Sequence, residues 1–450
     1  MDTPAPGTNP NCYELDVFGQ QPALNSLYTQ ITFCFSVSNA SSHPAIIKTL
    51  TGGLERLSAS FPWVAGQVVN GVSGDGNGDV FKIISSERMP RLIVKDLRDD
   101  PLVPSMEALK QANFPMSSLD ESVVAPRKTL PGNPDEYASE PTPVFLLQAN
   151  FIAGGLLLTF VALHSKRLLS KACRNEPFTS DEVSVGNLPR RNIIPLLDDS
   201  DSGLAHQVVR PTVSNNPIQV GAPPPRCRWA YFTFPSTSLA ILKSLATETM
   251  TLSSGYVSTD DALSALIWQS VSRARLPRLT SATKATFARA IDPRRYLGIP
   301  QTYPGLVQNM TYNAYTIQEL LAQPLGCVAS ELRAAVDPKT SNLGYKTRAL
   351  ATLLSRTADK GTISVTATLD LSVDIMLSSW GKVDSGLDFN LGFGKPDVVR
   401  RPQFVPVESL MYLMPKTSDG EIALAICLRD EDMERLRTDE EFTRYGIYVG

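Results

Sequence analysis

A segment rich in proline, asparagine, serine and glycine divides this chain near its middle. It covers residues 208–226 and reads VVRPTVSNNPIQVGAPPPR. The consecutive prolines Pro223, Pro224 and Pro225 favour an extended and stiff backbone, which is typical of a linker. A chain of 450 residues is also longer than a domain with a single hydrophobic core usually is. We therefore predict two domains, residues 1–207 and 227–450, with a small-molecule site in the cleft between them.

Composition and charge exclude several classes of protein. The hydrophobic fraction is 42% and the charged fraction 19%, which is typical of a globular chain. The net charge is -3 and lysine and arginine form no cluster, so we expect neither a nucleic-acid partner nor an anionic membrane. The N-terminus, MDTPAPGTNPNCYEL, has no secretory signal, and the longest apolar run, at residues 156–163, is shorter than the roughly 20 residues that span a bilayer. These features predict a cytoplasmic protein.

The six cysteines are scattered and include no C-x-x-C pair. We expect them to be buried thiols in a reducing compartment, and we expect no metal site. Their positions are Cys12, Cys34, Cys173, Cys227, Cys327 and Cys427.

Strand and helix patterns alternate irregularly in both halves. In the first half we predict a strand at residues 28–37, a helix at 43–61 that Pro62 ends, and a hairpin in which VFLLQANFI and LLLTFVALH flank Gly154 and Gly155. The sequence GVSGDGNGDV superficially resembles a phosphate loop, but no basic residue and no helix follow in register, so we predict a hairpin turn.

In the second half, STDDALSALIWQSVSRAR predicts an amphipathic surface helix that Ser258 or Thr259 caps and that serves as scaffold. Strand-like stretches follow at residues 363–370 and 422–430. Because the elements show no regular βαβ order, we predict an α+β fold with mixed sheets and flanking helices.

His164 is the first candidate for chemistry. It follows the apolar strand LLLTFVAL and precedes a polar turn that begins with Ser165 and Lys166. A histidine at a strand end beside a cleft is well placed as a general base, because its ordinary pKa is near 6.5. Position alone favours a structural histidine that closes the strand. The other two histidines, His43 and His206, have no comparable setting.

The second candidate is the sequence LDFNLGFGKPDVVRRP at residues 387–402. Gly392 and Gly394 flank Phe393, which suggests a tight backbone path that holds one ring in place. Taken alone, the pattern slightly favours an ordinary glycine-rich loop. A third stretch, AIDPRRYLGIPQTYPGL, brings together Asp292, Arg294 and Arg295 as candidates for ion pairs within the core.

Together these segments resemble the BAHD acyltransferase superfamily, and most closely its fungal branch typified by trichothecene 3-O-acetyltransferases. The most specific element is DFNLGFGKP, which resembles the family's DFGWGKP motif, with Phe393 at the position of the usual Trp and with extra spacing after Asp388 and Phe389. The helix at 258–275, the stretch DPRRYLGIP and the triplet SSW at 378–380 extend the resemblance over nearly the whole chain.

The resemblance implies two chloramphenicol-acetyltransferase-like domains with a channel between them. Acetyl-CoA would enter this channel as co-substrate from one face, and a hydroxylated metabolite such as a terpenoid or alkaloid from the other, with no metal and with the enzyme as a monomer. It implies His164 as the base that takes the proton of the acceptor hydroxyl. It implies a structural role for the glycine motif, with Asp388 paired to Arg294, and it makes the three residues Ser378, Ser379 and Trp380 candidates for the channel lining.

The chain departs from the family pattern directly after His164. Leu168 stands where the family has the Asp of its His-x-x-x-Asp motif, and Leu169 stands where it usually has Gly. We therefore keep two hypotheses: an O-acyltransferase that uses His164, and an impaired or repurposed relative that binds a metabolite or CoA without acyl transfer. A serine hydrolase is disfavoured because the sequence contains no G-x-S-x-G motif.

Overall fold

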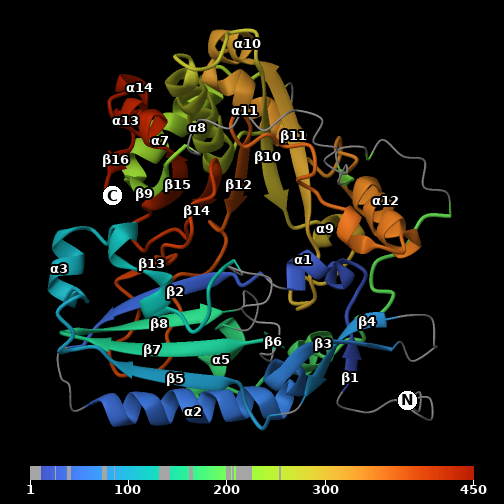
Figure 1. Ribbon diagram of the computed structural model, residues 1–450, viewed down its shortest axis with the longest axis vertical. Coiled ribbons are helices and arrows are strands. Elements are labelled where there is room, and N and C mark those ends of the chain that lie inside the picture. Colours follow the sequence, from blue (N-terminus) through green and yellow to red (C-terminus); the bar gives the residue numbers. More distant parts are fainter. Residues whose placement is uncertain are drawn as a thin grey trace, which may run out of the picture.

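Three β-sheets form the framework of the protein (Figure 1). The computed structural model describes residues 12–25, 27–37, 42–72, 79–85, 87–130, 142–161, 166–198, 204, 207–208, 225–252 and 255–450. Helices and strands follow one another without a βαβ repeat, which confirms the predicted α+β class. The predicted division of the chain at residues 208–226 stays a prediction, because most of that segment lies outside the described residues.

A five-stranded sheet carries the predicted hairpin of the first half. Its strand order is β13 (Val398–Arg400), β2 (Gln30–Ser36), β8 (Gly155–Val161), β7 (Leu146–Ile152) and β5 (Arg91–Asp96). β7 and β8 are buried along their whole length, as in a sheet that is covered on both faces, and Gln148, Asn150 and Thr159 are the polar residues among them. α2 (His43–Ser60) runs below this sheet in Figure 1, and α5 (Lys166–Cys173) packs against α2.

One strand of this sheet comes from the second half of the chain. β13 directly follows the glycine motif and pairs antiparallel with β2, with Val399 opposite Phe33. The two halves are therefore joined by backbone hydrogen bonds as well as by side-chain packing.

A small sheet stands beside the first, with the order β1 (Cys12–Glu14), β4 (Asp79–Ser85), β3 (Gly66–Val72) and β6 (Thr142–Pro143). β3 and β4 pair antiparallel in continuous register up to Val72 opposite Asp79. This pairing fits the hairpin predicted for GVSGDGNGDV, whose connecting residues 73–78 lie outside the described part of the chain.

A seven-stranded mixed sheet dominates the second half. Its order is β11 (Asn309–Thr316), β10 (Lys284–Ile291), β12 (Ile375–Ser379), β14 (Leu410–Leu413), β15 (Ile422–Arg429), β9 (Cys227–Phe234) and β16 (Ile447–Tyr448). β10, β12 and β14 run parallel, so their carboxyl ends meet at one edge. In Figure 1 that edge points toward the five-stranded sheet.

α8 (Thr259–Arg275) is the central helix of the second half, and the prediction of a surface helix is wrong. Ser258 caps it as expected, with Asp261 completing a capping box. Most of its residues are buried, because the seven-stranded sheet and other helices surround it. The helices packed around it are α7 (Ser236–Glu248), α10 (Ile317–Ala322), α11 (Leu325–Ala334), α13 (Asp430–Arg437) and α14 (Glu440–Thr443).

The strand expected at residues 363–370 is also wrong. Only Ile363 forms an isolated bridge, to Val208, and the following residues form turns. Side chains and backbone groups bond locally there, as in the contact between the hydroxyls of Ser364 and Thr366 at 3.0 Å. Serine and threonine compete in this way with sheet pairing. The strand predicted at 422–430 is confirmed as β15.

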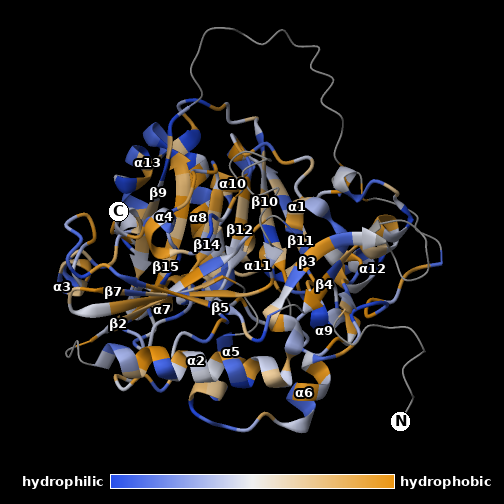
Figure 2. Ribbon diagram, turned by 60° about the horizontal axis from the view of Figure 1, so that its bottom comes forward, coloured by the Kyte–Doolittle hydropathy of each residue, from blue (hydrophilic) through white to orange (hydrophobic). Residues whose placement is uncertain are grey.

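The remaining helices lie at the periphery: α1 (Pro22–Asn25), α3 (Met106–Gln111), α4 (Glu121–Val124), α6 (Ser180–Gly186), α9 (Arg294–Leu297) and α12 (Leu343–Arg356). Figure 2 shows apolar residues concentrated in the strands, whereas α13 is strongly polar. None of the helices within the described ranges combines the length and the apolar run that crossing a bilayer requires.

The cysteines match their prediction only in part. Cys34, Cys173 and Cys427 are buried, whereas Cys12, Cys227 and Cys327 are half-buried. All six are free thiols. Burial raises the pKa of the Cys34 thiol to about 12, so this thiol stays protonated at neutral pH.

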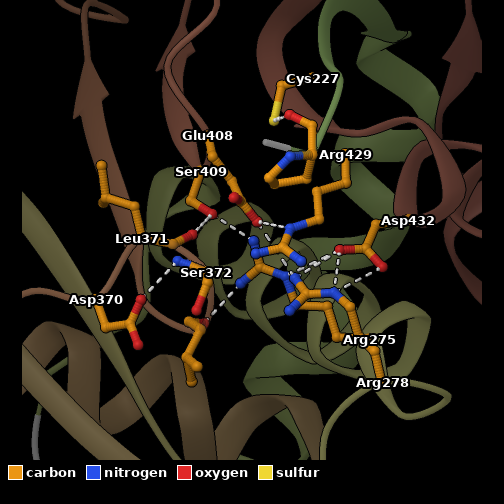
Figure 3. A network of polar contacts seen from close by, with 12 residues as sticks. Cys227, Arg275, Arg278, Asp370, Leu371, Ser372, Glu408, Ser409, Arg429 and Asp432 are labelled. Atoms are coloured by element: carbon orange, nitrogen blue, oxygen red, sulfur yellow. Dashed lines mark hydrogen bonds and ion pairs between the residues drawn. The ribbon is translucent and has the colours of Figure 1, made fainter. Parts of the chain in front are cut away.

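A buried charged network closes the far end of the seven-stranded sheet (Figure 3). Asp432 of α13 is inaccessible to solvent and accepts from Arg278 at 2.7 Å and from Arg435 at 2.5 Å. Arg275 of α8 lies 3.6 Å from the same carboxylate and is 1% exposed. Burial, together with the nearby charge of Arg278, lowers the pKa of Arg275 to about 10. One carboxylate thus compensates several guanidinium groups at the junction of α8, α13 and the sheet.

Candidate active site

His164 lies between the end of a buried strand and the start of a helix. Residues 162–165, His164 among them, lie outside the described residues. β8 ends at Val161, which pairs with Gln30 of β2 and with Leu146 of β7. α5 begins at Lys166. The two flanking elements therefore confine the candidate base to a connection of four residues.

The glycine motif packs against both of these flanking elements. The Phe389 ring is inaccessible to solvent and lies 5.3 Å from the Phe160 ring of β8, measured between centroids. The backbone carbonyl of Asp388 accepts hydrogen bonds from Ser170 Oγ of α5 and from Arg174 Nη1 directly after that helix, both at 2.6 Å. The motif therefore holds the strand before His164 and the helix after it.

The backbone of the motif needs its glycines. Gly392 has φ +91° and Gly394 has φ +74°, in the region that residues with a Cβ rarely adopt. Between them, the Phe393 ring lies 5.2 Å from the Phe35 ring of β2. The predicted tight path that holds one aromatic ring is present in the structure.

The expected ion pair between Asp388 and Arg294 is not formed in the described structure. Arg294 pairs with Asp292, at 2.8 Å. Its guanidinium also donates to the carbonyls of Tyr303 and Gly305, because Arg294 is buried beside the turn that carries them. The carboxylate of Asp388 instead accepts from the backbone N–H of Asn390, at 2.7 Å, within its own loop. The two residues thus stabilise separate turns.

Ser378, Ser379 and Trp380 lie together at the carboxyl end of β12. The Trp380 indole N–H donates to Ser378 Oγ at 3.1 Å, and Ser379 Oγ hydrogen-bonds to Asp260 at the start of α8. The Trp380 ring lies 5.0 Å from the Tyr412 ring of β14. This edge of the seven-stranded sheet is the one that faces the five-stranded sheet in Figure 1. Their role in lining a channel stays a prediction.

Arg401 joins this edge to β2, the strand that pairs with the strand preceding His164. Its guanidinium is buried 4.5 Å from the Tyr412 ring and 5.3 Å from the Trp380 ring. Its Nη1 donates to the carbonyl of Gln30 at 3.4 Å, and Gln30 is the residue that pairs with Val161. Arg401 therefore links the end of β12 to β2, at the residue that pairs with the end of β8. Arg401 is not among the predicted site residues, because nothing in a lone sequence distinguishes a buried arginine from an exposed one.

Lys166 is a second residue that the sequence analysis missed. It starts α5, is 6% exposed, and belongs to the elements that flank His164. Burial lowers the pKa of the Lys166 ammonium to about 8, and the nearby charge of Asp384 opposes that shift. Burial of an amine on an otherwise apolar helix face produces this effect.

We expect the stability of the protein to rise at alkaline pH because of Lys166. Its pKa is lower in the folded chain than the ordinary 10.5, so the unfolded chain binds more protons between pH 8 and 10.5, and the free energy of unfolding rises across that interval. The contribution should be about 1–3 kcal/mol. Urea unfolding of the wild type and of Lys166→Met at neutral and alkaline pH measures it. An equal pH dependence in both proteins would contradict this role.

No carboxylate stands four residues after His164. Leu168 is half-buried on α5, and Leu169 is fully buried. Cys173 Sγ and Leu169 Cδ1 lie so close to Gly53 of α2 that a Cβ there would meet them at 2.4 Å and 3.3 Å. These residues therefore serve the contact between α5 and α2. Within the described ranges, no cluster of His, Cys, Asp and Glu could hold a metal ion.

Comparisons with known families match both halves of the chain. The profile of the trichothecene 3-O-acetyltransferase-like N-terminal domain matches residues 27–173, and the profile of the Transferase family matches residues 228–443. The first match includes the His164 segment and the second includes the glycine motif.

Curated relatives match over nearly the full length. The O-acetyltransferase dmxR13 of Cryptosporiopsis sp. is 56% identical, with 97% of each chain covered. The trichothecene 3-O-acetyltransferase TRI101 of Fusarium sporotrichioides is 50% identical, again with 97% of each chain covered.

Solved structures show the same fold. TRI101 of Fusarium graminearum, crystallised with coenzyme A and deoxynivalenol, superposes with a TM-score of 0.90 at 47% identity, over 98% of this chain and 100% of that one. Vinorine synthase superposes with a TM-score of 0.63 at 15% identity, over 98% and 95% of the two chains, and so shares the fold.

Proposed function

This chain belongs to the trichothecene 3-O-acetyltransferase-like family of O-acyltransferases, and from that membership we propose that it transfers the acetyl group of acetyl-CoA to a hydroxyl group of a fungal metabolite. The acceptor class that we propose is a hydroxylated terpenoid, because relatives with the same fold were crystallised with coenzyme A and with deoxynivalenol or T-2. We further propose that the protein acts as a monomer in the cytosol, where free thiols such as those of Cys34 and Cys173 persist.

The observation that carries the proposal is the convergence of the two sheets beside the His164 segment. β8 delivers this segment to the junction at which Arg401 contacts both Gln30 and Trp380. Sites for small molecules concentrate at such junctions. The glycine motif contacts the two elements that flank this segment, β8 through Phe389 and α5 through the carbonyl of Asp388.

In the proposed reaction, His164 is the general base. A ring nitrogen of neutral His164 takes the proton of the acceptor hydroxyl as the oxygen attacks the thioester carbonyl. The carbon–sulfur bond then breaks, the ester forms, and the CoA thiolate receives the proton from the histidine. Atoms and charges balance in this direct transfer without a metal ion and without an acyl-enzyme. A positioned base contributes about a hundred- to ten-thousandfold to such a step.

A second candidate function follows from Leu168. Because a leucine of α5 stands where relatives of the BAHD type carry an orienting Asp, a chain with an intact fold could bind CoA or a metabolite without transferring the acyl group. Removal of an orienting Asp from a serine protease triad lowers kcat by about ten-thousandfold, which shows how large such a loss can be.

Acceptor-dependent release of CoA distinguishes the two functions. We expect free thiol to appear from acetyl-CoA at a rate that saturates with added deoxynivalenol, and to stay at the level of spontaneous hydrolysis without it. If calorimetry shows that the chain binds CoA, but no thiol is released when the acceptor is added, the binding function is supported instead. Acceptor-dependent transfer would exclude that second function.

A further inference from the structure

Arg401 is a cation that aromatic side chains enclose at the junction of the two sheets. It is 1% exposed, and its guanidinium lies 4.5 Å from the rings of Phe404 and Tyr412 and 5.3 Å from the ring of Trp380. Aromatic faces attract a cation, and they do so more strongly where water is excluded. The contact therefore fixes the position of the guanidinium and, in return, the positions of the rings around it.

No ion pair compensates the charge of Arg401 within the described part of the chain. Its hydrogen bonds to the carbonyl of Gln30 and to Thr129 Oγ1 are long, at 3.4 Å each, and its Nε has no acceptor. The Glu121 carboxylate accepts instead from Gln30 Nε2 at 2.9 Å and from the N–H of Thr129 at 2.7 Å. The guanidinium is therefore buried with weak polar compensation.

An apolar side chain could occupy the position of Arg401 without loss of stability. Burial takes the guanidinium out of water, and replacement of buried charged groups by well-packed apolar residues is often neutral or stabilising. Methionine is unbranched and adapts to irregular spaces in a core. The stability of the fold therefore does not explain an arginine here, and its contacts on two sides indicate another role.

The contacts of Arg401 connect two edges that meet at the junction. Trp380 and Tyr412 belong to the edge of the seven-stranded sheet that faces the five-stranded sheet in Figure 1. Gln30 begins β2 and pairs with Val161, the last residue of β8 before the connection that carries the proposed base. Because a guanidinium is planar and its donors form a rigid fork, it constrains the orientation of both edges.

We propose that Arg401 is a positioning residue for acyl transfer, which holds the indole ring of Trp380 at a fixed place relative to the end of β8. The guanidinium itself contacts neither substrate; it acts through Trp380 on the spacing between the two edges. This inference rests on the proposed function, which places the reaction at this junction. A misplacement of about 1 Å near reacting atoms can lower a rate about a hundredfold.

A double-mutant cycle between Arg401 and Trp380 tests the proposal. We expect Arg401→Met to lower kcat for acetyl transfer by about ten- to a hundredfold, with the KM for acetyl-CoA within about threefold of the wild type. Its urea midpoint should not fall below that of the wild type. In a Trp380→Phe background the same substitution should lower kcat by less than about threefold, because the two residues act as one unit. Arg401→Lys keeps the charge among the rings and should restore part of the rate.

The neighbouring arginine supplies the matched control. Arg400 is also 1% exposed, but its guanidinium lies over the Tyr231 ring, at 5.1 Å, and donates to the carbonyl of Val399 at 3.4 Å. Arg400→Met removes an equally buried cation without touching the contact with Trp380, so it should keep the wild-type kcat. Equal losses of kcat in the two methionine variants would overturn the proposal, as would an Arg401→Met loss that is the same with and without Trp380.

Tryptophan emission reports on the contact without turnover. Arg401→Met should change the emission spectrum of the folded protein, and most of this difference should disappear in the Trp380→Phe background. If the wild type transfers no acetyl group, the proposed function fails, and the emission comparison alone decides whether Arg401 holds Trp380. Emission that is unchanged by Arg401→Met, or a change of equal size without Trp380, would contradict the contact itself.

Discussion

Replacing His164 by alanine is expected to lower kcat for acetyl transfer by about a hundred- to ten-thousandfold, while the KM for acetyl-CoA changes little. The reason is that the hydroxyl must lose its proton as it attacks the thioester. His164 lies on the connection that follows β8, and β8 ends at the junction of the two sheets. Steady-state release of thiol at saturating acceptor measures the effect.

His206→Ala provides the matched control, because the chain contains only three histidines and His206 does not follow a central strand. This variant should retain the wild-type kcat. A His164→Ala variant that is folded and equally active would remove His164 from the reaction, and a general base on another element would then have to be sought.

Replacing Asp432 by alanine is expected to lower the free energy of unfolding by about 3–5 kcal/mol. The carboxylate is inaccessible to solvent and pairs with Arg278 and Arg435, while Arg275 lies nearby at 1% exposure (Figure 3). Removing it leaves Glu408, 3.4 Å from Arg278, as the remaining carboxylate beside these buried guanidinium groups, and an undercompensated buried charge costs more than the intact pair contributes. Urea denaturation followed by circular dichroism measures the change.

The adjacent residue supplies the control for this prediction. Glu431 lies on the same helix, α13, with an exposed side chain, and Glu431→Gln should leave the denaturation midpoint close to that of the wild type. Sodium chloride should have little effect on the difference between wild type and Asp432→Ala, since buried pairs are weakly screened. A difference that disappears at high salt would show that the network is solvated.

The parts of the fold that could be predicted from the sequence are those with strong local periodicity. The run of apolar residues around Gly154 and Gly155 became the central hairpin of β7 and β8, and Ser258 caps α8 as its position suggested. In these stretches local propensity and tertiary packing favour the same structure.

The errors have a common physical cause. The residues of α8 look amphipathic, yet Ser264 and Ser270 are buried because small hydroxyl side chains fit between closely packed helices as well as at the surface. Residues 363–370 have β-branched side chains, but turn hydrogen bonds such as that between Ser364 and Thr366 compete with sheet pairing. Tertiary context decided both cases.

The candidate site was predictable only where a motif was specific. The glycine motif correctly predicted a constrained loop, with Gly392 and Gly394 both at positive φ. Its partner did not follow from the sequence, because Asp388 contacts α5 through its backbone carbonyl and a carbonyl leaves no trace in residue identity. Arg401 and Lys166 were missed for a different reason. Burial gives these two side chains their properties, and burial is set by residues far away in the chain.

The most direct test of the proposed function is mass spectrometry of deoxynivalenol after incubation with the full chain and acetyl-CoA. We predict a product heavier by one acetyl group, formed by the wild type and strongly reduced with His164→Ala. If the wild type forms no acetylated product although calorimetry shows that it binds CoA and deoxynivalenol together, acetyl transfer to this acceptor class is contradicted and the binding function stands in its place.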